Sequence, residues 1–91
     1  MESATSSFIA ECFWPDVSEA DLDALDQRVA QAAAELDVRY LGSILLREDE
    51  VVLCQFEGTA AGVRKVVECA EVPFERILAT TTYPARGGPN T

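Results

Sequence analysis

Hydrophobic residues recur along the chain with two spacings, one typical of strands and one typical of amphipathic helices. Segments with these spacings follow one another along the chain. Segment 8–14 is apolar and aromatic, and it ends at Pro15, which cannot continue a central strand. Two further apolar runs, 38–47 and 51–57, are separated only by acidic residues, which predicts an antiparallel hairpin. Segment 74–83 contains a run of threonines and predicts a last strand.

Two other segments have the spacing of amphipathic helices. Ser18 stands three residues before Asp21, as in a capping box, and opens a long helical stretch. The apolar face of that stretch is formed by Leu22, Leu25, Val29, Ala32, Ala33 and Leu36. Thr59 follows Gly58, which breaks the preceding strand, and Thr59 is suited to cap a second helix. The apolar stripe of the second helix is formed by Ala60, Val63, Val66, Val67 and Ala70.

The predicted order of elements is therefore β-α-β-β-α-β. Right-handed crossovers then place the first and third strands at the centre of a four-stranded antiparallel sheet and lay both helices on one face. This is an α+β fold in one domain, which we expect over residues 8–83, with flexible tails at 1–7 and 84–91. The second face of the sheet stays open in a single copy of the chain.

Strand parity predicts which side chains meet the helices and which lie on the open face. The helix-facing set is expected to be Phe8, Ala10, Cys12, Trp14, Tyr40, Ile44, Leu46, Val52, Cys54 and Phe56. The open-face set is expected to be Ile9, Glu11, Phe13, Arg39, Leu41, Ser43, Leu45, Leu53, Gln55, Leu78, Thr80 and Thr82. A largely apolar open face with a few polar groups is typical of a dimer interface or of a pocket between two sheets.

The polar residues of the open face are the candidate ligand-binding groups, and they are Glu11, Arg39, Ser43, Gln55 and Thr80. Glu11 and Gln55 lie on the two central strands, so they need hydrogen-bonding partners or a ligand once the face is covered. Arg39 and Ser43 are the nearest candidate partners in the same chain. A second interpretation stays open, in which Glu11 only forms an ion pair with Arg39 or with a group of a second copy.

Charge and hydropathy exclude several classes of partner. The formal net charge of −9 repels phosphate backbones and anionic membrane surfaces, so we expect neither nucleic acid nor membrane as a partner. No apolar run is long enough to span a bilayer, and the first residues, MESATSS, lack the pattern of a secretory signal. We therefore expect a cytoplasmic protein.

The chain contains no histidine, which removes the commonest general base and the usual metal ligand. Its three cysteines, Cys12, Cys54 and Cys69, lack the spacing of a zinc or disulfide framework. Cys12 and Cys54 have the same parity on adjacent strands. Two interpretations of this pair stay open: a reactive or oxidised thiol pair, and two small buried hydrophobic side chains, which the sequence favours.

Four short motifs are distributed over the chain. The first two are Phe8-Ile9-Ala10-Glu11 before Pro15 and Val38-Arg39-Tyr40-Leu41 before Ser43. The other two are Cys54-x-Phe56-Glu57 before Val63-Arg64 and Val72-Pro73 before Ile77. With these motifs the chain resembles a small bacterial domain-of-unknown-function family whose described member is a nickel-binding, dimeric, ferredoxin-like protein. The resemblance implies a ferredoxin-like homodimer of the dimeric α+β-barrel type that binds a divalent metal such as nickel. Glu11 is then the candidate metal ligand, because only carboxylates and thiols are present as protein ligands.

Three functions from different classes follow. The first is a homodimeric protein that holds a small ligand or a divalent metal near Glu11 and Gln55. The second is a cofactor-independent enzyme of the dimeric α+β-barrel kind, an oxygenase, isomerase or cyclase acting on an apolar substrate. The third is a structural module that binds a partner through its acidic helix face. An enclosed cavity lined by Glu11 and tyrosines would favour the enzyme, and a filled interface would favour binding or assembly.

Overall fold

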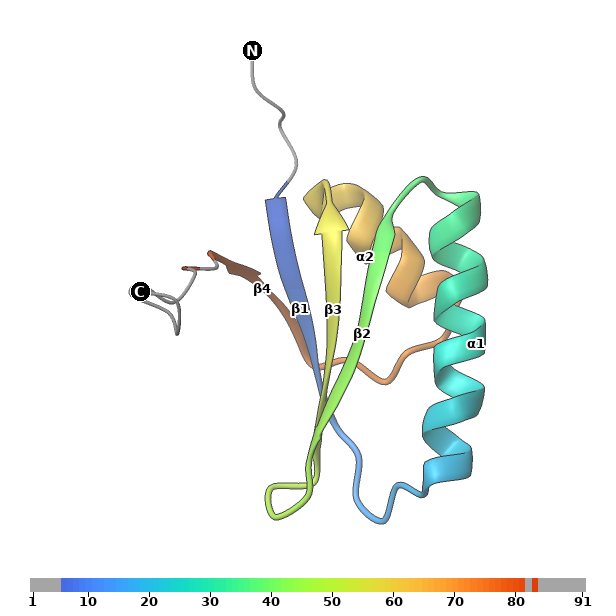
Figure 1. Ribbon diagram of the computed structural model, residues 1–91, viewed down its shortest axis with the longest axis vertical. Helices are drawn as coiled ribbons and strands as arrows, with labels where there is room; N and C mark the ends of the chain where they lie inside the picture. Colours follow the sequence, from blue (N-terminus) through green and yellow to red (C-terminus); the bar gives the residue numbers. More distant parts are fainter. Residues whose placement is uncertain (1–5, 82, 84–91) are drawn as a thin grey trace, which may run out of the picture.

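A computed structural model describes residues 6–81 and 83, and its elements follow the predicted order. They are β1 (Ser6–Phe13), α1 (Glu19–Glu35), β2 (Arg39–Leu46), β3 (Val51–Gly58), α2 (Ala60–Cys69) and β4 (Arg76–Thr80). The strands form one antiparallel sheet in the order β2-β3-β1-β4, so the first and third strands are central, as predicted (Figure 1). With two helices packed against this sheet, the chain has a ferredoxin-like α+β fold.

The helix starts are confirmed by their caps. The Ser18 hydroxyl accepts a hydrogen bond from the backbone N–H of Asp21, and the Asp21 carboxylate accepts one from the backbone N–H of Ser18, each at 3.0 Å. The Thr59 hydroxyl accepts the backbone N–H of Gly62 in the same way at the start of α2. These bonds satisfy backbone donors that the first helical turn leaves without an intrahelical partner.

The ends of the domain differ from the expectation. Ser6 and Ser7, expected in a tail, belong to β1, where they pair with Gly58 and Glu57 of β3. Strand β4 begins at Arg76 instead of at residue 74. Residues 1–5 and 84–91 of the expected tails, and Thr82 of the expected open face, lie outside the described residues.

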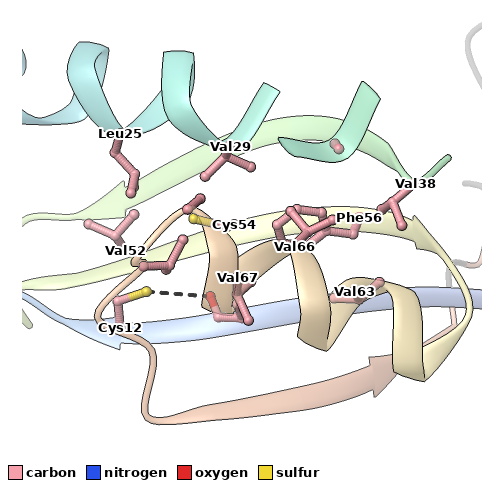
Figure 2. Close-up of a cluster of buried hydrophobic side chains, with 14 residues drawn as sticks. Cys12, Leu25, Val29, Val38, Val52, Cys54, Phe56, Val63, Val66 and Val67 are labelled. Carbon is pink, nitrogen blue, oxygen red and sulfur yellow. Dashed lines mark hydrogen bonds between the residues drawn. The ribbon is translucent and has the colours of Figure 1, made fainter. Parts of the chain in front are cut away.

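The hydrophobic core lies between the helices and one face of the sheet (Figure 2). The sheet contributes Ala10, Cys12, Val52, Cys54 and Phe56, and the helices contribute Leu25, Val29, Ala33, Val63, Val66 and Val67. No polar or charged side chain is buried among the residues that the structure describes. On β1 and β3 the helix-facing set is therefore the one that parity predicts.

Strand β2 contains an irregularity that the parity argument missed. The pairing with β3 shifts register between Tyr40 and Gly42, and Gly42 has a φ of 115°, a conformation that favours glycine. After this bulge, the residues of β2 point to the faces opposite to those that simple alternation predicts. The predicted orientation of four residues is therefore wrong: Ser43 and Leu45 face the helices opposite Cys54 and Val52, while Ile44 and Leu46 lie on the open face opposite Leu53 and Val51.

Candidate functional site

The face of the sheet turned away from the helices, called the open face below, consists of four rows of paired residues. These rows are Arg39–Glu57–Ser7–Thr80, Gly42–Gln55–Ile9–Leu78, Ile44–Leu53–Glu11–Arg76 and Leu46–Val51–Phe13. Several large hydrophobic side chains are exposed here, namely Phe13 (52%), Ile44 (44%), Leu46 (40%) and Leu78 (36%), with Leu41 (46%) in the bulge beside them. A face this apolar is unusual on a protein that acts alone.

Glu11 lies within this apolar surface and forms an ion pair with Arg76, its direct neighbour on β4. Nε of Arg76 donates a hydrogen bond to Oε1 of Glu11 at 2.5 Å. The hydrogen bond to the Glu11 carboxylate and the negative charge of that group raise the pKa of Arg76. The expected same-chain partner of Glu11, Arg39, is engaged elsewhere, because Nη1 of Arg39 lies 3.4 Å from Oε1 of Glu57. The suggestion of a Glu11–Arg39 pair within the chain is therefore wrong.

The structure brings only part of the predicted site together. Glu11 and Gln55 lie on adjacent central strands in neighbouring rows of the open face. Arg39 and Thr80 share this face, but their row lies four residues along β1 from Glu11, which is about 13 Å. Ser43 is on the opposite face, where its Oγ lies 3.4 Å from Oδ1 of Asp26 in α1.

A hollow of about 350 Å³ adjoins Glu11 and is lined by Glu11, Phe13, Val51 and Glu75. The backbone N–H of Glu75 donates to the carbonyl oxygen of Glu11 at 2.7 Å, which holds the residue before β4 against β1. Neither Glu75 nor Arg76 is among the site residues that the sequence predicts. Strand parity contained the signal for Arg76, since this residue has the same parity as Leu78 and Thr80.

The residues around Glu11 do not fit a nickel site. Within residues 6–81 and 83, no three side chains of the types histidine, cysteine, aspartate and glutamate are grouped to hold a metal ion. Glu11 Oε1 already accepts a hydrogen bond from the guanidinium of Arg76, and a metal ion bound through the same oxygen would have to displace it. Nickel also favours imidazole, which this chain does not contain.

The thiols and the tyrosines are not part of the hollow. Cys12 and Cys54 are fully buried on the helix side, where Sγ of Cys12 donates to the carbonyl oxygen of Ala10 at 4.0 Å (Figure 2). The hydrogen bond with Cys12, together with burial, raises the pKa of Cys54. Tyr40 also faces the helices, and Tyr83 is 85% exposed beyond β4. The combination of Glu11 with tyrosines that would favour an enzyme is therefore not formed around this hollow.

None of the helices within the described residues is both long and apolar enough to cross a membrane. Comparison with family models gave no match, and comparison with curated proteins gave none either. The fold is similar to that in the crystal structure of SCO4226 from Streptomyces coelicolor A3(2), with a TM-score of 0.76 and 16% sequence identity. The similarity covers 87% of this chain and 100% of that chain. At this identity the likeness shows a shared fold.

Proposed function

We propose that this chain forms a homodimer through the open faces of two sheets, and that the dimer holds a small ligand beside Glu11 and Gln55. The observation that carries the proposal is the set of large hydrophobic side chains exposed on the open face, led by Phe13 and Ile44. Their transfer from water into an interface is favourable in proportion to the apolar area buried.

The size of the open face supports a second copy as its occupant. Three strands of eight residues and β4 of five residues cover a patch of about 19 Å by at most about 26 Å. Side chains that project from the sheet add accessible surface to this flat area. The total then approaches the roughly 800 Å² that each partner buries in a standard interface. Two sheets packed face to face also produce a core like that of a β-sandwich, with side chains from both inner faces interdigitating.

The hollow beside Glu11 supports a ligand between the sheets. Its apolar lining, Phe13 and Val51, suits an apolar group, while the carboxylates of Glu11 and Glu75 suit a hydrogen-bond donor or a cationic group. The net charge of −9 also favours a neutral or cationic molecule over an anion. We therefore propose a small organic ligand with an apolar part and a donor or amine group.

The dimer is tested by sedimentation velocity over a dilution series. The wild type should sediment as a dimer at high micromolar concentration, and Leu53→Glu should be monomeric because it places a charge at the centre of the interface. Ala30→Glu, an exposed position on α1, is the matched control and should remain dimeric. A monomeric wild type, or a Leu53→Glu variant as dimeric as the control, would contradict the proposal.

The ligand is tested by native mass spectrometry on protein purified without a tag, with and without added nickel. A retained organic mass that is lost in Glu11→Gln, at a protein concentration at which this variant is still dimeric, would support the proposed site. Stoichiometric uptake of nickel would contradict the conclusion that these residues do not fit that metal.

A further inference from the structure

We propose that the Glu11–Arg76 ion pair is shared between the two copies of the dimer. Each Glu11 carboxylate keeps its own Arg76 and also binds the guanidinium of the partner's Arg76. This inference rests on the homodimer proposed above. It names the contact that fixes how one open face sits on the other, and it makes the ion pair incomplete in a single copy.

Unused hydrogen-bonding capacity of the pair supports this contact. A guanidinium has five N–H donors, and the Nε–H of Arg76 is the donor engaged with Glu11. Within residues 6–81 and 83, the remaining donors of Arg76 and Oε2 of Glu11 have no hydrogen-bond partner. Water satisfies these groups while the face is exposed. A partner that covers the face must replace that water, because unsatisfied charged groups are expensive to bury.

The position of the pair on the open face also supports the contact. The pair lies in the same row as Leu53 and Ile44, and Phe13, Ile9 and Leu78 lie in the adjacent rows. A partner that buries these hydrophobic side chains therefore also buries Glu11 and Arg76. The side chain of Arg76 is 63% exposed and that of Glu11 is 29% exposed, so both are accessible to groups arriving from the open side.

Two-fold symmetry supplies a partner for each group of the pair. In a two-fold dimer, a contact from residue i to residue j of the partner is repeated as j to i. A two-fold axis that passes beside this pair turns each arginine toward the carboxylate of the other copy. The result is a cluster of two positive and two negative charges with no net charge. Like-charged groups on the same face oppose other registers of the two sheets.

The decisive experiment mixes two charge-reversed variants, Glu11→Lys and Arg76→Glu. Each variant alone places like charges against each other, within the chain and across the interface, and its dimer dissociation constant should rise by more than roughly tenfold. When the two variants are mixed, the lysine introduced at position 11 of one copy meets the glutamate introduced at position 76 of the other. Native mass spectrometry should then show mostly heterodimer, well above the one-to-two-to-one distribution of random pairing. The double variant Glu11→Lys/Arg76→Glu should dimerise like the wild type.

The Arg39–Glu57 pair is the matched control, because it is also a cross-strand ion pair on the open face but lies at its end. Mixing Arg39→Glu with Glu57→Lys should give no preference for the heterodimer. If a reversed variant does not fold, Glu11→Gln and Arg76→Gln replace it, and each should weaken the dimer without a like-charge contact. A wild type that is monomeric overturns the homodimer and this inference with it. A dimeric wild type whose charge-reversed variants pair at random overturns this inference alone.

Discussion

The phenol hydroxyl of Tyr40 donates a hydrogen bond to Oδ1 of Asp26 and thereby joins edge strand β2 to helix α1. Asp26 also faces Ser43, whose Oγ lies 3.4 Å from the same oxygen. In a regular strand, residues 40 and 43 point to opposite faces. The bulge between Tyr40 and Gly42 is what brings both hydroxyls to the same carboxylate.

Removing the Tyr40 hydroxyl should therefore destabilise the fold. We expect Tyr40→Phe to lower the free energy of unfolding by about 1.5 kcal/mol, the lower end of the range for hydrogen bonds to charged groups, because the residue is half-buried. The ring contact with Phe56, at a centroid distance of 5.3 Å, is retained in this variant. Urea denaturation measures the change, and Ser43→Ala, which removes only the longer contact, should have the smaller effect. Equal effects would contradict this ranking of the two contacts.

The same hydrogen bond should make stability depend on pH in the alkaline range. Burial and the hydrogen bond to Asp26 raise the pKa of Tyr40 above its ordinary value of about 10. The folded state then holds this proton more tightly than the unfolded state. Its contribution to stability is complete below about pH 10 and is lost as the pH rises further. The free energy of unfolding of the wild type should thus fall more steeply above pH 10 than that of Tyr40→Phe. Parallel pH profiles for the two proteins would show that Tyr40 is not responsible.

The bulge itself makes Gly42 a sensitive position. Its φ of 115° is a conformation that residues with side chains rarely adopt, and no heavy atom beyond its two chain neighbours lies within 4 Å of a Cβ placed there. We therefore expect Gly42→Ala to cost about 1–3 kcal/mol from backbone strain and not from a steric clash. Thermal or urea unfolding measures the loss. A D-alanine introduced at position 42 by chemical synthesis should avoid most of it, since this φ suits the opposite chirality. A similar loss for both alanines would point to a clash or a packing effect instead.

Much of the fold was predictable because periodicity and caps are local properties. Ser18 with Asp21, and Thr59 before its apolar stripe, mark helix starts that the structure confirms. The order of the strands followed from the handedness of the crossovers. The face of Ser43 was not predictable by simple alternation, because one extra residue in β2 reverses every later position. Gly42 within an apolar strand was the local signal of that bulge.

The candidate site was less predictable than the fold because it depends on the register between strands far apart in the sequence. Glu11 was identified as a charge in an apolar strand, but its partner Arg76 is distant along the chain and lies opposite it only through the β1–β4 pairing. The last strand was expected to begin at residue 74, and nothing in that prediction marked Arg76 as the partner of Glu11. Arg39 was preferred as a partner although its own cross-strand neighbour, Glu57, neutralises it.

The three cysteines should differ sharply in reactivity, because their burial differs. Cys69 is exposed at the end of α2, while Cys12 and Cys54 are fully buried in the core. The thiolate is the reactive form, and the raised pKa of Cys54 disfavours it further. A thiol reagent in native buffer should modify Cys69 alone, and all three cysteines should react after denaturation. Cys69→Ser should show no fast reaction. Rapid modification of Cys12 or Cys54 in the folded protein would instead revive the interpretation of a reactive thiol pair, because access to these sulfurs requires the helices to separate from the sheet.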